Sequence, residues 1–256
     1  MRGFANRWVG AAALAGLMLL GGPASAEELV RFMSAGRGEE IQGYLTRPKG
    51  AGPFPAVVLL HTCLGLPADR AALGQQVANW GYVALFVDDF ATRGLKETCA
   101  VDFDPAAADA YGALAFLSAL PFVDKARIGA VGFSQGADTA LKIAASASGS
   151  DPGFKAAAAF YPPCANEAGA SLKIPTLILV GASDDVTPAA DCERLKARQP
   201  ASMAKLVVYP GARHGFDLPE FGGGRPVLGM TLAYDRPAAE KSRAELRDFL
   251  ARRLAR

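Results

Sequence analysis

The pentapeptide Gly-Phe-Ser-Gln-Gly at 132–136 has the spacing Gly-x-Ser-x-Gly, which is typical of a nucleophilic serine held on a sharp turn. The apolar run 128–133 predicts a strand that leads into Ser134, and we expect a helix over 135–146. Such a turn lifts the hydroxyl above a sheet, and glycine on either side leaves space for a close backbone approach. The strand–turn–helix context makes the motif far more specific than the pentapeptide alone.

Ser134 needs a base, since an unassisted hydroxyl is a poor nucleophile. The chain has two histidines, His61 and His214. We predict His214 as the base, because it follows a strand predicted over 206–209 and comes after the serine in the chain. A hydrogen-bonded structural histidine is the alternative interpretation of His214. His61, the only competitor, precedes the serine.

An acid that orients the imidazole is expected between the serine and the base, in the loop 181–188 after a strand predicted over 174–180. Asp184 and Asp185 are adjacent in this loop. Adjacent side chains point in different directions, so only one of them is expected to reach His214. The other is then a solvated or helix-capping residue.

The oxyanion of an attacked carbonyl needs hydrogen-bond donors that are already in place. We expect the backbone N–H of Gln135, the residue after the nucleophile, to be one donor. The second is expected from the loop 61–65, which follows a strand predicted over 56–60, and we choose the N–H of Cys63, with that of Leu64 as the alternative. A reactive thiol at Cys63 is a rival interpretation, but Ser134 already fills the nucleophile position.

Short apolar runs alternate with helical patterns along the chain, which predicts a mostly parallel sheet of about eight strands with helices on both faces. A hairpin is expected to open the sheet. Ligand sites in such sheets lie at the carboxyl ends of the strands, where Ser134 and its partners are expected. The predicted strands are 29–34, 41–46, 56–60, 82–87, 128–133, 156–161, 174–180 and 206–209, and the predicted helices are 69–80, 105–120, 135–146, 188–198 and 235–254.

The composition fits a folded domain with a sizeable core. Of the 256 residues, 51% are hydrophobic and 20% are charged, which argues against a disordered or fibrous protein. The formal net charge of +2 gives no electrostatic reason to expect a nucleic-acid or anionic-membrane partner. Two histidines in all argue against a histidine-rich metal cage, and we expect neither a metal nor a cofactor.

Residues 1–26 have the pattern of a secretory signal peptide. Arg2 and Arg7 precede an apolar stretch over 8–20, and Ala-Ser-Ala at 24–26 resembles a cleavage site. We therefore expect export to the periplasm or the medium, no membrane attachment after cleavage, and one mature domain over 27–256. An uncleaved membrane anchor is the alternative, but the apolar run is short for a span.

Four cysteines form an even set in a compartment that permits disulfides: Cys63, Cys99, Cys164 and Cys192. Four cysteines allow three pairings, and the residues alone leave the choice open. Buried free thiols are the alternative.

The chain resembles the dienelactone hydrolase family of the α/β-hydrolase superfamily over most of residues 40–254. The resemblance rests on the segments 58–61 with Gly65, 89–94, 181–188 and 209–216, together with the elbow at Ser134. It implies an α/β-hydrolase fold and hydrolysis of esters or lactones without a cofactor. The spacing of Asp184 from Gly181 and Pro188 is that of related hydrolases, and favours Asp184 over Asp185 as the acid.

Three departures from the family pattern bear on the substrate. The enzyme that names the family has a cysteine where this chain has Ser134, and an activating glutamate near the place of Thr62. It binds a lactone carboxylate through two arginines, of which Arg93 matches one, while the other falls near Leu218. We therefore expect a neutral or mono-anionic ester, with Arg93 as either a substrate-binding or a structural residue.

The resemblance also suggests a pairing of the cysteines. Cys63 and Cys99 lie in predicted loops at the catalytic edge, whereas Cys164 and Cys192 follow two other strands of that edge. We hypothesise the disulfides Cys63–Cys99 and Cys164–Cys192.

The sequence thus predicts an exported serine hydrolase that cleaves small carboxylic esters or lactones through an acyl-enzyme. A serine peptidase on the same fold is one alternative, although such enzymes usually carry a further gating domain. A non-catalytic binding protein that keeps the fold is the other. The oligomeric state is left open.

Overall fold

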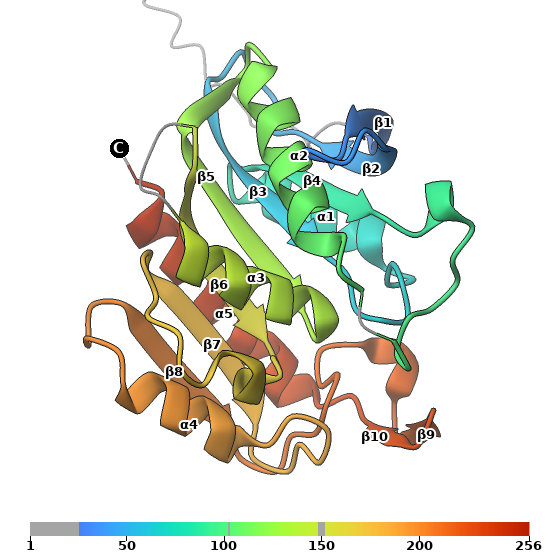
Figure 1. Ribbon diagram of the computed structural model, residues 1–256, viewed down its shortest axis with the longest axis vertical. Coiled ribbons are helices and arrows are strands. Elements are labelled where there is room, and N and C mark those ends of the chain that lie inside the picture. Colours follow the sequence, from blue (N-terminus) through green and yellow to red (C-terminus); the bar gives the residue numbers. More distant parts are fainter. Residues whose placement is uncertain (1–25, 102, 148–151, 256) are drawn as a thin grey trace, which may run out of the picture.

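A single eight-stranded sheet runs through the computed structural model, which describes residues 26–101, 103–147 and 152–255. Its strand order is β1-β2-β4-β3-β5-β6-β7-β8 (Figure 1). The strands are β1 (Glu28–Met33), β2 (Glu40–Thr46), β3 (Phe54–Leu60), β4 (Val83–Asp88), β5 (Val123–Phe133), β6 (Phe154–Phe160), β7 (Thr176–Gly181) and β8 (Ala204–Tyr209). Each strand predicted from the sequence is present. The predicted signal peptide, 1–26, lies outside the described residues except for Ala26.

The sheet is mostly parallel, as predicted. β1 and β2 form an antiparallel hairpin, and β2 pairs antiparallel with β4. The other neighbours, from β4 and β3 to β8, pair in parallel. Strands covered on both faces need continuous apolar runs, and residues 56–60 of β3 are accordingly all buried.

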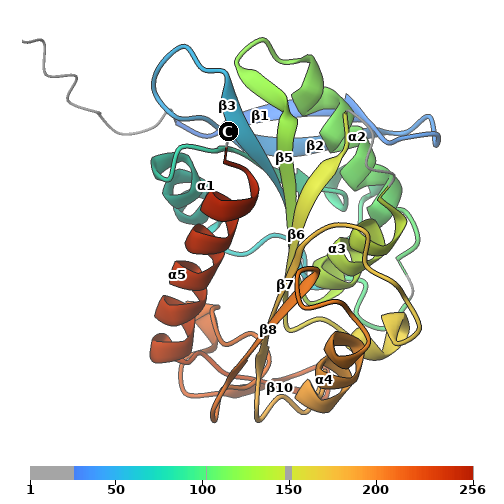
Figure 2. The same cartoon turned by 90° about the vertical axis from the view of Figure 1, so that its left-hand side faces the viewer.

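Helices cover both faces of the sheet. Figure 2 shows the sheet edge-on, with α1 and α5 on one side and α2, α3 and α4 on the other. The helices are α1 (Arg70–Asn79), α2 (Ala106–Ala119), α3 (Gln135–Ser146), α4 (Ala189–Ala197) and α5 (Arg236–Arg253), joined by short 3₁₀ turns η1 (Ala91–Arg93), η2 (Cys164–Glu167) and η3 (Pro219–Phe221). Asp235 caps α5, and its carboxylate accepts a 2.9 Å hydrogen bond from the Ala238 amide. Over the described ranges, no helix has the length and apolar character needed to cross a bilayer.

The segment after His214 contains a hairpin that the sequence did not predict. β9 (Arg225–Val227) and β10 (Met230–Leu232) pair antiparallel in a region for which no strand was predicted. Strands of three residues around Pro226 and Gly229 carry too little periodicity to be recognised. The hairpin matters for the site, because β10 ends against the backbone of His214.

Candidate active site

Ser134 lies on a strained turn between β5 and α3. Its φ of 52° and ψ of −110° are rarely adopted by residues other than glycine. The neighbouring glycines permit this turn: a Cβ on Gly132 would lie 1.9 Å from the carbonyl oxygen of Gly136, and a Cβ on Gly136 would lie 2.3 Å from that of Leu60. No side chain fits at either glycine, which is the physical reason for the Gly-x-Ser-x-Gly spacing.

Three side chains from separate loops meet at the carboxyl edge of the sheet. Ser134 follows β5, Asp184 follows β7 and His214 follows β8. His214 Nε2 lies 2.9 Å from Ser134 Oγ, and His214 Nδ1 lies 2.9 Å from Asp184 Oδ2. His214 and Asp184 are buried. With Nδ1–H donating to the carboxylate, Nε2 is left as an acceptor for the serine proton.

The surroundings of Asp184 favour its ionised form. Its Oδ1 accepts hydrogen bonds from the amides of Val186 and Thr187 at 2.9 and 2.8 Å, and its Oδ2 accepts one from the Thr187 hydroxyl at 2.9 Å. Burial acts to raise the pKa of Asp184, but His214 and these amides outweigh it and hold the pKa below its ordinary value.

Asp185 points elsewhere. Its side chain is exposed and pairs with Arg213 at 3.1 Å. Of the two adjacent aspartates, the structure therefore brings only Asp184 to His214. The two side chains point in different directions, as we expected for neighbouring residues.

His214 is held on further sides by Tyr161 and by β10. The Tyr161 ring meets the imidazole edge-on at 4.7 Å between centroids, and the backbone of Tyr161 has a positive φ of 41°. The carbonyl of His214 accepts a 3.2 Å hydrogen bond from the Ala233 amide, directly after β10. Sequence reasoning missed both contacts, because neither residue belongs to a recognisable motif.

The loop after β3 lies beside the elbow. The Gly136 amide donates to the His61 carbonyl at 3.0 Å, which joins the start of α3 to this loop. The Leu64 amide donates to Thr62 Oγ1 at 3.1 Å, whereas the Cys63 amide has no hydrogen-bond partner among the described residues. Of the two amides considered for the oxyanion, Cys63 is therefore the one available.

Two hollows adjoin Ser134. A cleft of about 370 Å³ extends over the first turns of α3 and has a mixed polar lining that includes Thr98, Gln135, Asp138 and Asn166. A much smaller, mainly apolar pocket of about 20 Å³ lies beside His214 and is lined by Leu64, Leu218, Met230 and Leu232 among others. Cys63 and Ser134 line both hollows. An ester bound at Ser134 would therefore have the narrow pocket on one side and the wide cleft on the other.

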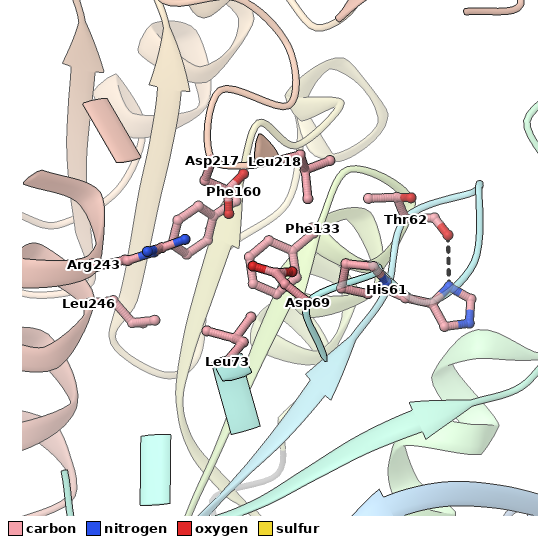
Figure 3. A pocket seen from close by; sticks show the side chains of 11 residues that line it. His61, Thr62, Asp69, Leu73, Phe133, Phe160, Asp217, Leu218, Arg243 and Leu246 are labelled. Carbon is pink, nitrogen blue, oxygen red and sulfur yellow. Dashed lines mark hydrogen bonds between the residues drawn. The ribbon is translucent and has the colours of Figure 1, made fainter. Parts of the chain in front are cut away.

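A further apolar cavity lies on the α1–α5 side of the sheet. Figure 3 shows Leu73 from α1 facing Leu246 from α5 across it, with Arg243 and Asp217 nearby. Asp217 is buried and accepts a 2.8 Å hydrogen bond from the Tyr161 hydroxyl. Burial raises the pKa of Asp217 to about 6, against the smaller opposing effect of that hydrogen bond.

His61, at the edge of the same cavity, forms a second histidine–aspartate pair. Its Nε2 lies 2.7 Å from Asp89 Oδ1, its Nδ1 lies 2.7 Å from the Thr62 carbonyl oxygen, and its ring meets Phe90 edge-on (Figure 3 marks the contact with Thr62). Burial acts to lower the pKa of His61, but the Asp89 carboxylate outweighs it and the pKa is raised. A histidine and an aspartate directly after neighbouring strands were the available signal for this pair.

The contacts of Arg93 favour the structural one of the two roles we considered for it. Its five N–H donors all contact protein oxygens: the carboxylates of Glu39 and Asp109, and the Asp89 carbonyl. Asp109 is fully buried, so the arginine neutralises a charge inside the fold. No donor of Arg93 is left for a substrate carboxylate.

The hypothesised disulfides are both confirmed. Cys63 is bonded to Cys99 and Cys164 to Cys192, and no free cysteine stands in the described ranges. The first bridge is partly exposed at the cleft, whereas both cysteines of the second are buried.

Comparisons with known proteins agree with this arrangement. A family model described as "Dienelactone hydrolase family" matches residues 41–254. A Methylorubrum extorquens protein named as a carboxymethylenebutenolidase is 29% identical over 201 residues, 69% of this chain and 68% of that protein. Cutinase 1 of Thermobifida cellulosilytica is 26% identical over 192 residues, 74% of this chain and 70% of the cutinase. A dienelactone hydrolase-like promiscuous phosphotriesterase from metagenomic libraries shares the fold, with a TM-score of 0.72 at 22% identity over 90% of this chain and 100% of that chain.

Proposed function

Since the chain belongs to the dienelactone hydrolase family, has the α/β-hydrolase fold and is a carboxylic ester hydrolase, we propose that it works through the triad Ser134, His214 and Asp184. One observation carries this proposal: the unbroken chain of 2.9 Å contacts from the Ser134 hydroxyl through the His214 imidazole to the Asp184 carboxylate. Hydroxyl, imidazole and carboxylate in this order are what a serine nucleophile needs.

In the first step, Ser134 Oγ attacks the ester carbonyl while His214 Nε2 takes its proton. The Asp184 carboxylate holds the Nδ1 proton in place and stabilises the imidazolium that forms. The amides of Gln135 and Cys63 donate hydrogen bonds to the tetrahedral oxyanion. His214 then protonates the leaving alcohol, and an acyl group remains on Ser134.

In the second step, water takes the place of the alcohol. His214 removes a proton from the water as it attacks the acyl carbonyl, and returns that proton to Ser134 Oγ when the ester bond to the serine breaks. A carboxylic acid leaves, and the enzyme is restored without a metal or a cofactor in any step.

The substrate that fits this site is a small, uncharged ester or lactone. The donors of Arg93 are occupied by Glu39, Asp109 and Asp89, and Leu218 offers no charge to a substrate carboxylate. The relative from Methylorubrum extorquens is named for a lactone, and the one from Thermobifida cellulosilytica for cutin.

Export is part of the proposal. Residues 1–26 have the charge and apolar pattern of a cleavable signal peptide. Two disulfides in a chain of this size support an oxidising compartment, since they seldom persist in the cytosol. N-terminal sequencing of the protein from the periplasm or medium tests this, and we expect Glu27 as the first residue.

The activity is tested with p-nitrophenyl esters of graded acyl length, comparing the wild-type protein with Ser134→Ala. We expect turnover of short neutral esters by the wild type alone. Adding a carboxylate to the acyl group is expected to reduce kcat/KM. Equal rates for the two proteins would refute the enzyme and leave a binding protein, whereas selective cleavage of p-nitroanilide peptides would favour a peptidase.

A further inference from the structure

The dipeptide Thr98–Cys99 touches both residues whose amides we assign to the oxyanion. The Thr98 amide donates a 2.9 Å hydrogen bond to the Cys63 carbonyl, and Cys99 is bonded covalently to the Cys63 sulfur. The Thr98 hydroxyl donates to the Gln135 side-chain Oε1 at 3.0 Å. Thus one short segment bridges the loop after β3 and the start of α3.

The bridging segment is itself anchored. Thr98 is buried at 3% exposure although it lies in a loop without helix or strand, and the Cys99 amide donates to Glu97 Oε2 at 2.8 Å. Cys63 belongs to a turn in which the Gly65 amide bonds the Thr62 carbonyl. That turn fixes the backbone path through Cys63 and Leu64, and Thr98 and Cys99 hold the turn in place against α3 from outside.

We propose that Thr98 and Cys99 are positioning residues, which hold the Cys63 and Gln135 amides at the spacing that a tetrahedral oxyanion requires. This inference rests on the proposed function. Oxyanion donors stabilise the transition state more than the bound substrate only if they are fixed before the reaction. Loosening them lowers kcat and leaves KM nearly unchanged.

The second disulfide provides a matched control. Cys164–Cys192 spans 28 residues and Cys63–Cys99 spans 36, so the two bridges restrict the unfolded chain to a similar extent. Cys192 lies in α4, where its sulfur contacts the Pro162 carbonyl, and neither cysteine of this pair lines the cleft beside Ser134. Removing either disulfide tests its contribution to general stability, whereas removing Cys63–Cys99 also tests the positioning of the oxyanion donors.

The experiment compares Cys63→Ser/Cys99→Ser with Cys164→Ser/Cys192→Ser on p-nitrophenyl acetate. Loss of one fixed oxyanion donor costs about 10²- to 10³-fold in kcat, so loosening of two is expected to cost roughly tenfold to a hundredfold. We expect this fall in kcat, with KM within about threefold, for the first variant only. A kcat within twofold of the control variant would overturn the proposal.

A second pair of variants keeps both disulfides, and so remains informative if a serine variant fails to fold. Thr98→Val removes the hydroxyl that reaches Gln135, while Thr98→Ser retains it. We expect kcat to fall about fivefold or more in Thr98→Val and to stay within twofold of wild type in Thr98→Ser. An equal fall in both would assign Thr98 to packing alone and overturn its positioning role.

Backbone hydrogen exchange separates failure of this inference from failure of the proposed function. Absence of wild-type turnover would refute the function. Independently, the amides at 62–64 are expected to exchange faster in Cys63→Ser/Cys99→Ser than in the control variant, and unchanged exchange would refute the positioning role.

Discussion

Two buried histidine–aspartate pairs lie at the carboxyl edge of one sheet, and only one of them is arranged for proton transfer. His214 and Asp184 approach to 2.9 Å, and His61 and Asp89 approach to 2.7 Å. The difference lies at the second ring nitrogen. His214 presents it to the Ser134 hydroxyl, whereas His61 presents it to the Thr62 carbonyl.

A hydroxyl both donates and accepts, but a carbonyl oxygen only accepts. Nε2 of His214 can therefore accept a hydrogen bond from the Ser134 hydroxyl. His61 faces oxygen atoms at both nitrogens, and the Asp89 carboxylate outweighs burial and raises its pKa. The same two residue types thus leave one ring nitrogen at a hydroxyl in one pair and hold the ring between two oxygen acceptors in the other.

The largest expected effect separates the two histidines. His214→Ala should lower kcat by roughly 10⁵- to 10⁶-fold, because the nucleophile and base act as one unit. His61→Ala should stay within about tenfold of wild-type kcat at a temperature where it is folded, since this ring contacts neither Ser134 nor the oxyanion amides. Steady-state kinetics with circular dichroism checks both, and a comparable loss of kcat in a folded His61→Ala protein would remove the distinction.

The two neighbouring aspartates sharpen the comparison. Asp184→Asn is expected to lower kcat by roughly 10⁴-fold, because the amide no longer favours the tautomer that leaves His214 Nε2 free. Asp185→Asn, whose only contact of note is an exposed ion pair with Arg213, should change kcat less than twofold. If Asp185→Asn were the more damaging variant under the same assay, the assignment of the acid would be reversed.

The His61–Asp89 pair is expected to affect the stability of the protein rather than its catalysis. Asp89→Asn removes the carboxylate from the buried His61 and is expected to cost about 3 kcal/mol of unfolding free energy near pH 6, measured by urea denaturation. The folded-state pKa of His61 is raised, so the pair's contribution is complete below about pH 6.5 and is lost as pH rises through the folded value. The difference between Asp89→Asn and wild type should therefore shrink at alkaline pH, and a constant difference would contradict the ion pair.

A further buried carboxyl, Asp217, contacts a tyrosine hydroxyl where Asp184 and Asp89 each contact a histidine. Its raised pKa of about 6 means that the folded state binds its proton more tightly than the unfolded state, so wild-type stability falls as pH rises from about 4 through 6. Asp217→Asn keeps the shape and cannot ionise. We expect it to be more stable than wild type by about 3 kcal/mol at pH 8 and no more stable at pH 4, by thermal or urea unfolding. Equal stability at both pH values would contradict the raised pKa.

Elements with a clear local pattern could be predicted from the sequence. Short elements, and contacts between residues far apart in the chain, were harder to predict. The run 56–60 and its counterparts showed the parallel strands of the sheet, because such strands must be apolar on both faces, and the two short runs before them showed the antiparallel hairpin β1–β2. β5 begins at Val123 rather than at residue 128. Residues 124–127 near its start are mostly polar, so the sequence carries no apolar run there that would predict a strand. The hairpin β9–β10 was missed for its brevity.

The site divides in the same way. Ser134, Asp184 and His214 follow three strands in a recognisable order, so their convergence could be predicted. Arg93 could not be classified, because the carboxylates of Glu39 and Asp109 that occupy it come from distant elements.

The role of the His214 pair is tested most directly by mapping where a fluorophosphonate attaches to the intact protein. Its phosphorus is attacked as an ester carbonyl is, and the adduct survives peptide mass analysis. We expect one adduct, on Ser134, formed by wild type and by His61→Ala and lost in His214→Ala. Labelling that is absent from Ser134, or that persists undiminished in His214→Ala, would contradict the proposed triad.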